Sequence, residues 1–125
     1  MIVLMKRSIF SLFVIIVLCS NGSFIYALQD KVQQYLKEAD YYNRKADGYE
    51  REAQYYVDKG NGYIRQAEYY TRKNDSGRAR IYTSRANDAF EKAKLRKKWA
   101  QDAREKAELR LKWARQQSER SNIGK

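Results

Sequence analysis

Tyrosines and small residues recur every seven positions between residues 35 and 70, and this spacing constrains the fold more than any other feature of the sequence. A strict seven-residue period keeps one face of a helix turned towards a partner helix, as in a left-handed coiled coil. A strand would need alternation with a period of two, which is absent here. The tyrosines are Tyr35, Tyr42, Tyr49, Tyr56, Tyr63 and Tyr70, and the small residues are Ala39, Ala46, Ala53, Gly60 and Ala67.

A second arm follows with its own seven-residue row. Two stretches of this arm, EKAKLRKKWA at 91–100 and EKAELRLKWA at 105–114, differ at two positions only. Between the arms, residues 74–77 read NDSG, which is a turn sequence in which Asp75 or Ser76 can cap the following helix. The chain has no proline to interrupt either arm. The alanines of the second row are Ala79, Ala86, Ala93, Ala100, Ala107 and Ala114.

These patterns predict an all-α fold, an antiparallel two-helix hairpin with an Ala/Tyr coiled-coil seam, completed by self-association. The Tyr/Ala-rich arm and turn occupy 28–77, with its helix at about 29–73. The basic Ala/Trp arm is a helix over 78–118, and 119–125 form a disordered tail. An alternative is a three-helix stack of the tetratricopeptide type, broken at 60–62 by the glycines there, although the signature of that repeat is absent.

A hairpin centred on the turn predicts a register in which facing residue numbers add to 153. This register places Ala53 opposite Ala100. It also places the seam tyrosines, and three tyrosines one step across from them, close to large side chains of the second arm. The predicted neighbours are Tyr41 with Trp113, Tyr55 with Trp99, Tyr69 with Arg85, Tyr49 with Arg104, Tyr56 with Lys97 and Tyr63 with Phe90.

The first 27 residues are typical of a signal peptide. Lys6 and Arg7 precede an apolar run from Ile9 to Cys19, which is short for a bilayer span. We expect cleavage after Ala27, with cleavage after Gly22 as the alternative. The protein is then exported, periplasmic or secreted. Otherwise, residues 8–28 stay uncleaved as a membrane anchor. Asn74-Asp75-Ser76 is a glycosylation sequence in a eukaryotic secretory pathway.

The composition argues against an enzyme. There is no histidine, and the one cysteine lies in the leader, so the commonest general base, nucleophile and metal ligands are missing from the exported chain. No phosphate-binding loop and no spacing of metal ligands occurs, so we expect no catalytic residue, no metal and no cofactor. The carboxylates alternate with lysines and arginines on helix faces, where we expect them to be solvated charges that stabilise the helices.

Two surfaces are candidate binding sites. The first is aromatic, since a row of tyrosines and the two tryptophans leaves apolar surface that two helices do not cover. The second is cationic, because 78–125 hold 15 basic and 6 acidic residues whereas 28–77 hold 9 of each. The candidate interface residues are Tyr41, Tyr55, Tyr69, Trp99 and Trp113. The candidate anion-binding residues are Arg96, Lys97, Lys98, Arg104, Lys106, Arg110, Lys112 and Arg115.

The sequence therefore predicts an exported, non-enzymatic protein that acts as a structural or protein-interaction element. Its partners would be further copies of itself or helices of another protein. One alternative is an extracytoplasmic binder of an anionic polymer or membrane surface through the basic second helix. Another is a small secreted effector or inhibitor. We do not expect nucleic acid as a partner, because export removes the chain from it.

Overall fold

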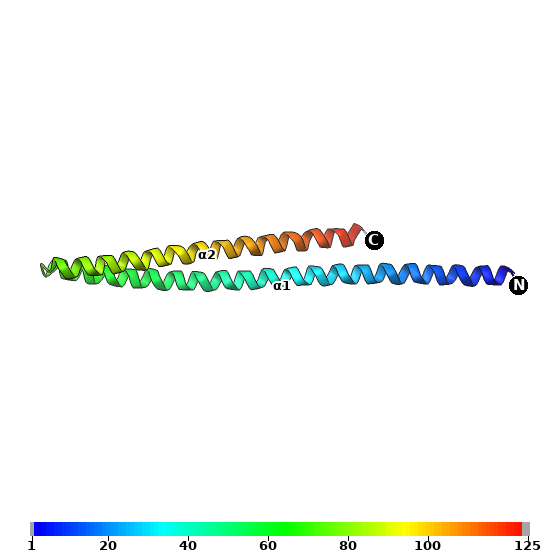
Figure 1. Cartoon of the computed structure of the whole chain (residues 1–125), viewed down its shortest axis with the longest axis horizontal. Coiled ribbons are helices and arrows are strands. Elements are labelled where there is room, and N and C mark those ends of the chain that lie inside the picture. The colour runs from blue at the N-terminus through cyan, green and yellow to red at the C-terminus, as the bar shows by residue number, and fades with distance from the viewer. Residues whose placement is uncertain (1, 124–125) are drawn as a thin grey trace. The chain divides into compact units, whose positions relative to one another are not determined.

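The chain folds into two α-helices joined by a tight turn in a computed structural model (Figure 1). The structure describes the backbone of residues 2–123 and the side chains of residues 22–123. α1 spans Ile2–Arg72 and α2 spans Ser76–Ile123, and no strand occurs between these ends. The predicted all-α, two-helix hairpin is confirmed at this level.

The turn is built from three residues that end one helix and begin the next. Asn74 adopts a left-handed conformation with φ of 57°. The amide of Asp75 donates to the carbonyl of Tyr70, and that of Asn74 donates to Thr71, which is the Schellman arrangement for a helix C-terminus. The Asp75 carboxylate then accepts a hydrogen bond of 3.0 Å from the amide of Arg78. Asp75 is therefore the N-cap of α2, one of the two caps predicted.

The helix bounds differ from the predicted bounds, and α1 is continuous. α1 begins at Ile2 instead of near 29, so the helix continues through the turn-type sequence Asn21-Gly22-Ser23. Cleavage of the leader remains a prediction. α2 continues to Ile123, so the predicted disorder of 119–125 is wrong for 119–123. α1 also runs unbroken through 60–62, so the three-helix alternative is wrong.

The described chain divides into two units. The turn unit comprises residues 39–108 and contains the turn with the adjoining parts of both helices. The end unit comprises the chain up to Glu38 together with the chain from Leu109 onward. Each unit pairs a segment of α1 with a segment of α2.

Alanines form the core of the turn unit. Every buried hydrophobic side chain in the described part of the chain is an alanine. Ala46, Ala100 and Ala103 form a cluster against which Tyr49 packs. Small side chains let the two backbones approach closely, and larger side chains then pack beside them. The buried alanines of the turn unit are Ala39, Ala46, Ala53, Ala67, Ala86, Ala89, Ala93, Ala100, Ala103 and Ala107.

The register of the two helices differs from the predicted register. In the turn unit, residue numbers of several partners add to 148, not 153. The turn is centred on Asn74, whereas the predicted register required a centre between Ser76 and Gly77. A tighter turn shifts α2 along α1, so the ring partners of Tyr49 and Tyr63 differ from the predicted ones. Pairs with the observed sum are Tyr49 with Trp99, Glu52 with Arg96, and Tyr56 with Lys92.

Candidate functional site

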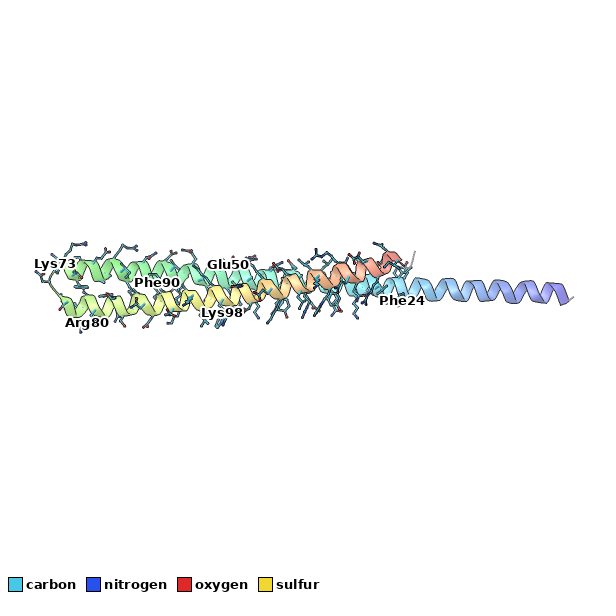
Figure 2. The ribbon with its side chains drawn as sticks, turned by 90° about the horizontal axis from the view of Figure 1, so that it is seen from above. Phe24, Glu50, Lys73, Arg80, Phe90 and Lys98 are labelled. Atoms are coloured by element: carbon cyan, nitrogen blue, oxygen red, sulfur yellow. The ribbon has the colours of Figure 1, made fainter. Side chains whose placement is uncertain are left out.

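Gly60 is buried on the seam, where it faces Phe90 of α2. A Cβ atom at this position would lie 2.6 Å from Cε1 of Phe90, a separation that real Cβ atoms essentially never show. Phe90 lies on the part of α2 labelled in Figure 2. The missing side chain therefore makes room for the Phe90 ring. This contact replaces the predicted pairing of Phe90 with Tyr63, since Tyr63 instead lies 6.2 Å from the Tyr82 ring.

Each tryptophan packs on a seam tyrosine within its own unit. Trp99 meets Tyr49 edge-to-face at 5.5 Å in the turn unit, and Trp113 meets Tyr35 in the same way at 5.6 Å in the end unit. These pairs correct the predicted contact of Trp99 with Tyr55 and of Trp113 with Tyr41. The tryptophans therefore contribute to packing between the helices.

An arginine lies over each tryptophan and reaches a glutamate of α1. Arg96 lies 4.2 Å from the Trp99 ring centroid, and its Nε donates to Glu52 at 2.5 Å. Arg110 repeats this arrangement in the end unit, at 4.5 Å from Trp113 with a 2.5 Å bond to Glu38. The tyrosine, glutamate, arginine and tryptophan of one set lie 14 positions from their counterparts in the other set. We call each set a 14-residue module. The sequence shows the 14-residue repeat but not these pairings.

Arg104 is the third arginine of the predicted anion-binding set that is held by α1 carboxylates. It lies 2.8 Å from Glu50 and 3.0 Å from Asp47 instead of over the Tyr49 ring, as had been predicted. The hydrogen bonds from Glu50 and then Asp47 raise its pKa above an already high ordinary value. Arg104 therefore stays charged at every ordinary pH. The stability that its ion pairs contribute would be lost only if the pH rose through this raised pKa.

The other predicted anion-binding residues divide into two groups. Lys106 lies with its Nζ atom 5.8 Å from the Tyr42 ring centroid. The remaining four form no ion pair with another described residue. The pairing of three arginines with α1 carboxylates thus leaves less free positive charge on α2 than its composition predicts. The four residues are Lys97, Lys98, Lys112 and Arg115.

The three remaining interface candidates form an exposed row on α1. Tyr41, Tyr55 and Tyr69 are 57%, 59% and 46% exposed, although each ring meets its neighbouring tyrosine edge-to-face at 5.2–5.3 Å. A lysine four residues on places its Nζ 5.7–5.8 Å from each ring centroid. Each exposed ring is therefore held between a second ring and a cation. The predicted contact of Tyr69 with Arg85 is replaced, since Arg85 lies over Tyr82 at 5.3 Å.

Two glycines lie at the positions halfway between these tyrosines. A Cβ atom at Gly48 would meet only the Arg51 guanidinium at 4.0 Å, and one at Gly62 only that of Arg65 at 3.8 Å. Both positions therefore have room for a side chain, unlike Gly60. We call Tyr41, Gly48, Tyr55, Gly62 and Tyr69 the Tyr/Gly row.

The described side chains, from Gly22 to Ile123, include no helical segment long and apolar enough to cross a membrane. The leader run from Ile9 to Cys19, and most of the alternative anchor at 8–28, lie outside these residues. The same part of the chain gathers no group of metal-ligating side chains at one point. The surface of this part of the chain consists of helix faces on which aromatic rings, cations and glycines alternate. Comparisons with protein-family models, curated proteins and solved structures found no match for this chain.

Proposed function

We propose that this chain is an exported, non-enzymatic interaction protein that associates with itself through the Tyr/Gly row of α1. The single observation that supports this proposal most is the pair of glycines, Gly48 and Gly62. Each costs about 1 kcal/mol in a helix interior relative to alanine, and no contact with another described residue requires it. A glycine on an open helix face is useful where another backbone or ring approaches closely.

The alternation of large and small residues makes the row complementary to itself. When two copies of α1 lie antiparallel with an offset, Tyr55 of one copy faces Gly62 of the other, and Tyr69 faces Gly48. The interface is then isologous, so each ring–glycine contact forms twice. The rings are already held by their neighbours, which lowers the entropy lost on binding. A coiled-coil bundle of two hairpins is the assembly that we propose.

Charge beside the row sets how this association responds to salt. Basic residues outnumber acidic ones on both flanks, so two copies repel one another at low ionic strength. Added salt screens this repulsion, and we expect the oligomer to strengthen as salt rises towards 1 M, where the Debye length is about 3 Å. Binding to an anionic polymer has the opposite salt dependence. The basic flanking residues are Arg44, Arg51, Arg65 and Arg72 on one side, and Lys45, Lys59 and Lys73 on the other.

Sedimentation velocity of the protein purified after expression with its own leader tests this proposal. We expect oligomers that grow with protein concentration and persist at high salt. Replacing the three tyrosines of the row by alanine should give a monomer. A matched control, Ile81→Ala with Leu95→Ala, removes exposed apolar side chains of α2 and should leave the oligomer intact. A wild-type protein that sediments as a monomer at every concentration and salt would exclude the proposal.

A further inference from the structure

Two clefts between α1 and α2 in the turn unit are built from the same residues, 14 positions apart. The shared residues of the first cleft are Tyr42, Lys45, Tyr49, Asp102 and Lys106, with Ala103 at its base. Those of the second are Tyr56, Lys59, Tyr63, Asp88 and Lys92, with Ala89 at its base. Only one lining position differs, since Trp99 in the first cleft is replaced by Arg85 in the second. The cleft volumes are about 240 and 190 Å³.

The repetition places two equivalent sites along one face of the turn unit. The same seven-residue positions of both helices line each cleft, so both clefts open in the same direction. A spacing of 14 residues corresponds to about 21 Å along a helix. A ligand with a repeating structure can therefore occupy both clefts at once, whereas a small molecule would fill them independently.

Two lysines, one from each helix, provide positive charge at each cleft. Lys45 and Lys106 have their Nζ atoms 5.8 Å from the centroids of the Tyr41 and Tyr42 rings, respectively. In the second cleft, Lys59 and Lys92 lie over Tyr55 and Tyr56 in the same way. None of these four lysines forms an ion pair with another described residue. Their ammonium groups are positioned by ring faces and can meet an anionic group of a ligand.

An aspartate in each cleft limits which anion fits. Asp102 and Asp88 form no ion pair or hydrogen bond with the described residues, and a carboxylate only accepts hydrogen bonds. Each would repel a chain of bare phosphates but would accept a hydrogen bond from a hydroxyl group. The Tyr42 ring already has Lys106 over it and Tyr41 at its side, which leaves little room for a stacked base.

We propose that the two clefts bind one acidic polysaccharide chain. Carboxylate or sulfate groups of the sugar units meet the paired lysines, sugar hydroxyls donate to Asp102 and Asp88, and the tyrosine rings lie beside the sugar rings. This site differs from the basic surface of α2 predicted from the sequence, because only Lys106 belongs to both. The site adjoins the Tyr/Gly row, since Lys45 and Lys59 lie over Tyr41 and Tyr55 of that row, but all of its residues belong to one copy of the chain.

Calorimetric titration of the full chain at 0.15 M salt tests the site. The probe is chondroitin sulfate, which carries carboxylates, sulfates and hydroxyls, with neutral dextran and inorganic polyphosphate for comparison. Lys45→Gln with Lys106→Gln disables the first cleft and should weaken binding of the long polysaccharide roughly 100-fold, because attachment at two points is lost. Lys59→Gln with Lys92→Gln should give a similar loss. Circular dichroism checks that each variant remains helical.

The matched control is Lys97→Gln with Lys98→Gln, which removes two charges of α2 outside both clefts. We expect a change of about threefold or less, since distant charges are screened. Asp102→Asn with Asp88→Asn should strengthen binding of polyphosphate more than binding of chondroitin sulfate, because both ligands gain from the lost negative charge but the sugar hydroxyls lose a charged acceptor. The proposal is overturned if the control weakens binding as much as a cleft variant does. It is also overturned if wild-type protein binds polyphosphate more tightly than the polysaccharide.

Discussion

At the scale of single residues, three glycines of α1 have different roles although they lie on the same helix. Gly60 faces Phe90 across the seam, whereas Gly48 and Gly62 face away from α2 into open space. The sequence places all three in helix interiors, where each is costly. Only the structure separates a glycine that the fold requires from two that it does not.

Substituting Gly60 by alanine should therefore destabilise the protein. The new Cβ atom would lie 2.6–2.9 Å from three atoms of the Phe90 ring, so the ring or the helices must move. We expect a loss of about 1–3 kcal/mol in the free energy of unfolding, measured with urea at low protein concentration. Phe90→Leu in the same chain should restore part of it.

Gly62→Ala is the matched control, two residues further along α1. It meets nothing nearer than 3.8 Å, so the gain in helix propensity should stabilise the protein by up to about 1 kcal/mol. Equal effects of the two substitutions would contradict the close contact at Phe90.

At the scale of the helices, the 14-residue repeat brings the same four types of side chain together in each module. Arg96 bridges the helices by binding Glu52 while its guanidinium lies over Trp99. Its side chain is 22% exposed, whereas that of Arg104 is 41% exposed although Arg104 has two carboxylate partners. Exposed ion pairs contribute little, because water and salt screen them. The Arg96 guanidinium also packs over the Trp99 ring, and this contact stabilises the protein although the charge is only partly buried.

Arg96→Ala should therefore cost more stability than Arg104→Ala. We expect about 1–3 kcal/mol for Arg96, since a cation–ring contact and a charged hydrogen bond are both lost. For Arg104 we expect a smaller loss, because water and salt screen its exposed ion pairs. Thermal unfolding at low and high salt provides the comparison, and the effect of Arg96→Ala should persist at high salt. A larger effect of Arg104→Ala at both salt concentrations would contradict this ranking.

At the scale of the whole molecule, the pairing of the two helices in the turn unit determines which side chains meet. Two arms that both repeat every seven residues pair almost equally well in several registers. The turn selects one of them, because Asn74 reverses the chain within three residues. Ala46 consequently clusters with Ala100 and Ala103, whereas the register predicted from the sequence places it opposite Ala107.

Cysteine pairs distinguish the two registers in a chain that carries Cys19→Ser. Ala46→Cys with Ala103→Cys should form an intrachain disulfide readily on mild oxidation, because both positions belong to one buried cluster. Ala46→Cys with Ala107→Cys has the residue sum of 153 and should oxidise more slowly. Gel mobility without reductant measures both rates. Faster oxidation of the second pair would show that the observed register is wrong.

Much of the fold follows from particular residues of the sequence. The tyrosine and alanine spacing of α1 predicts the helix and its seam, and Asp75 is predicted as a cap. One feature of α2 was missed, a second seam row at Ala89, Arg96, Ala103 and Arg110 that alternates alanine with arginine. The sequence signal for this row is its position. Each member lies three residues after one alanine of the first α2 row and four residues before the next. The long basic side chains concealed it, because arginine is normally assigned to a solvated face.

The sequence by itself determined that this chain is helical, that it reverses near Asn74 and that small residues line the contact, since backbone propensity and periodicity are local properties. Only the tertiary structure decided the register, the pairing of each tryptophan with a tyrosine, and which arginines are held by carboxylates. These depend on which side chains of the two helices lie side by side. A periodic sequence leaves that choice open, and the three-residue turn makes it.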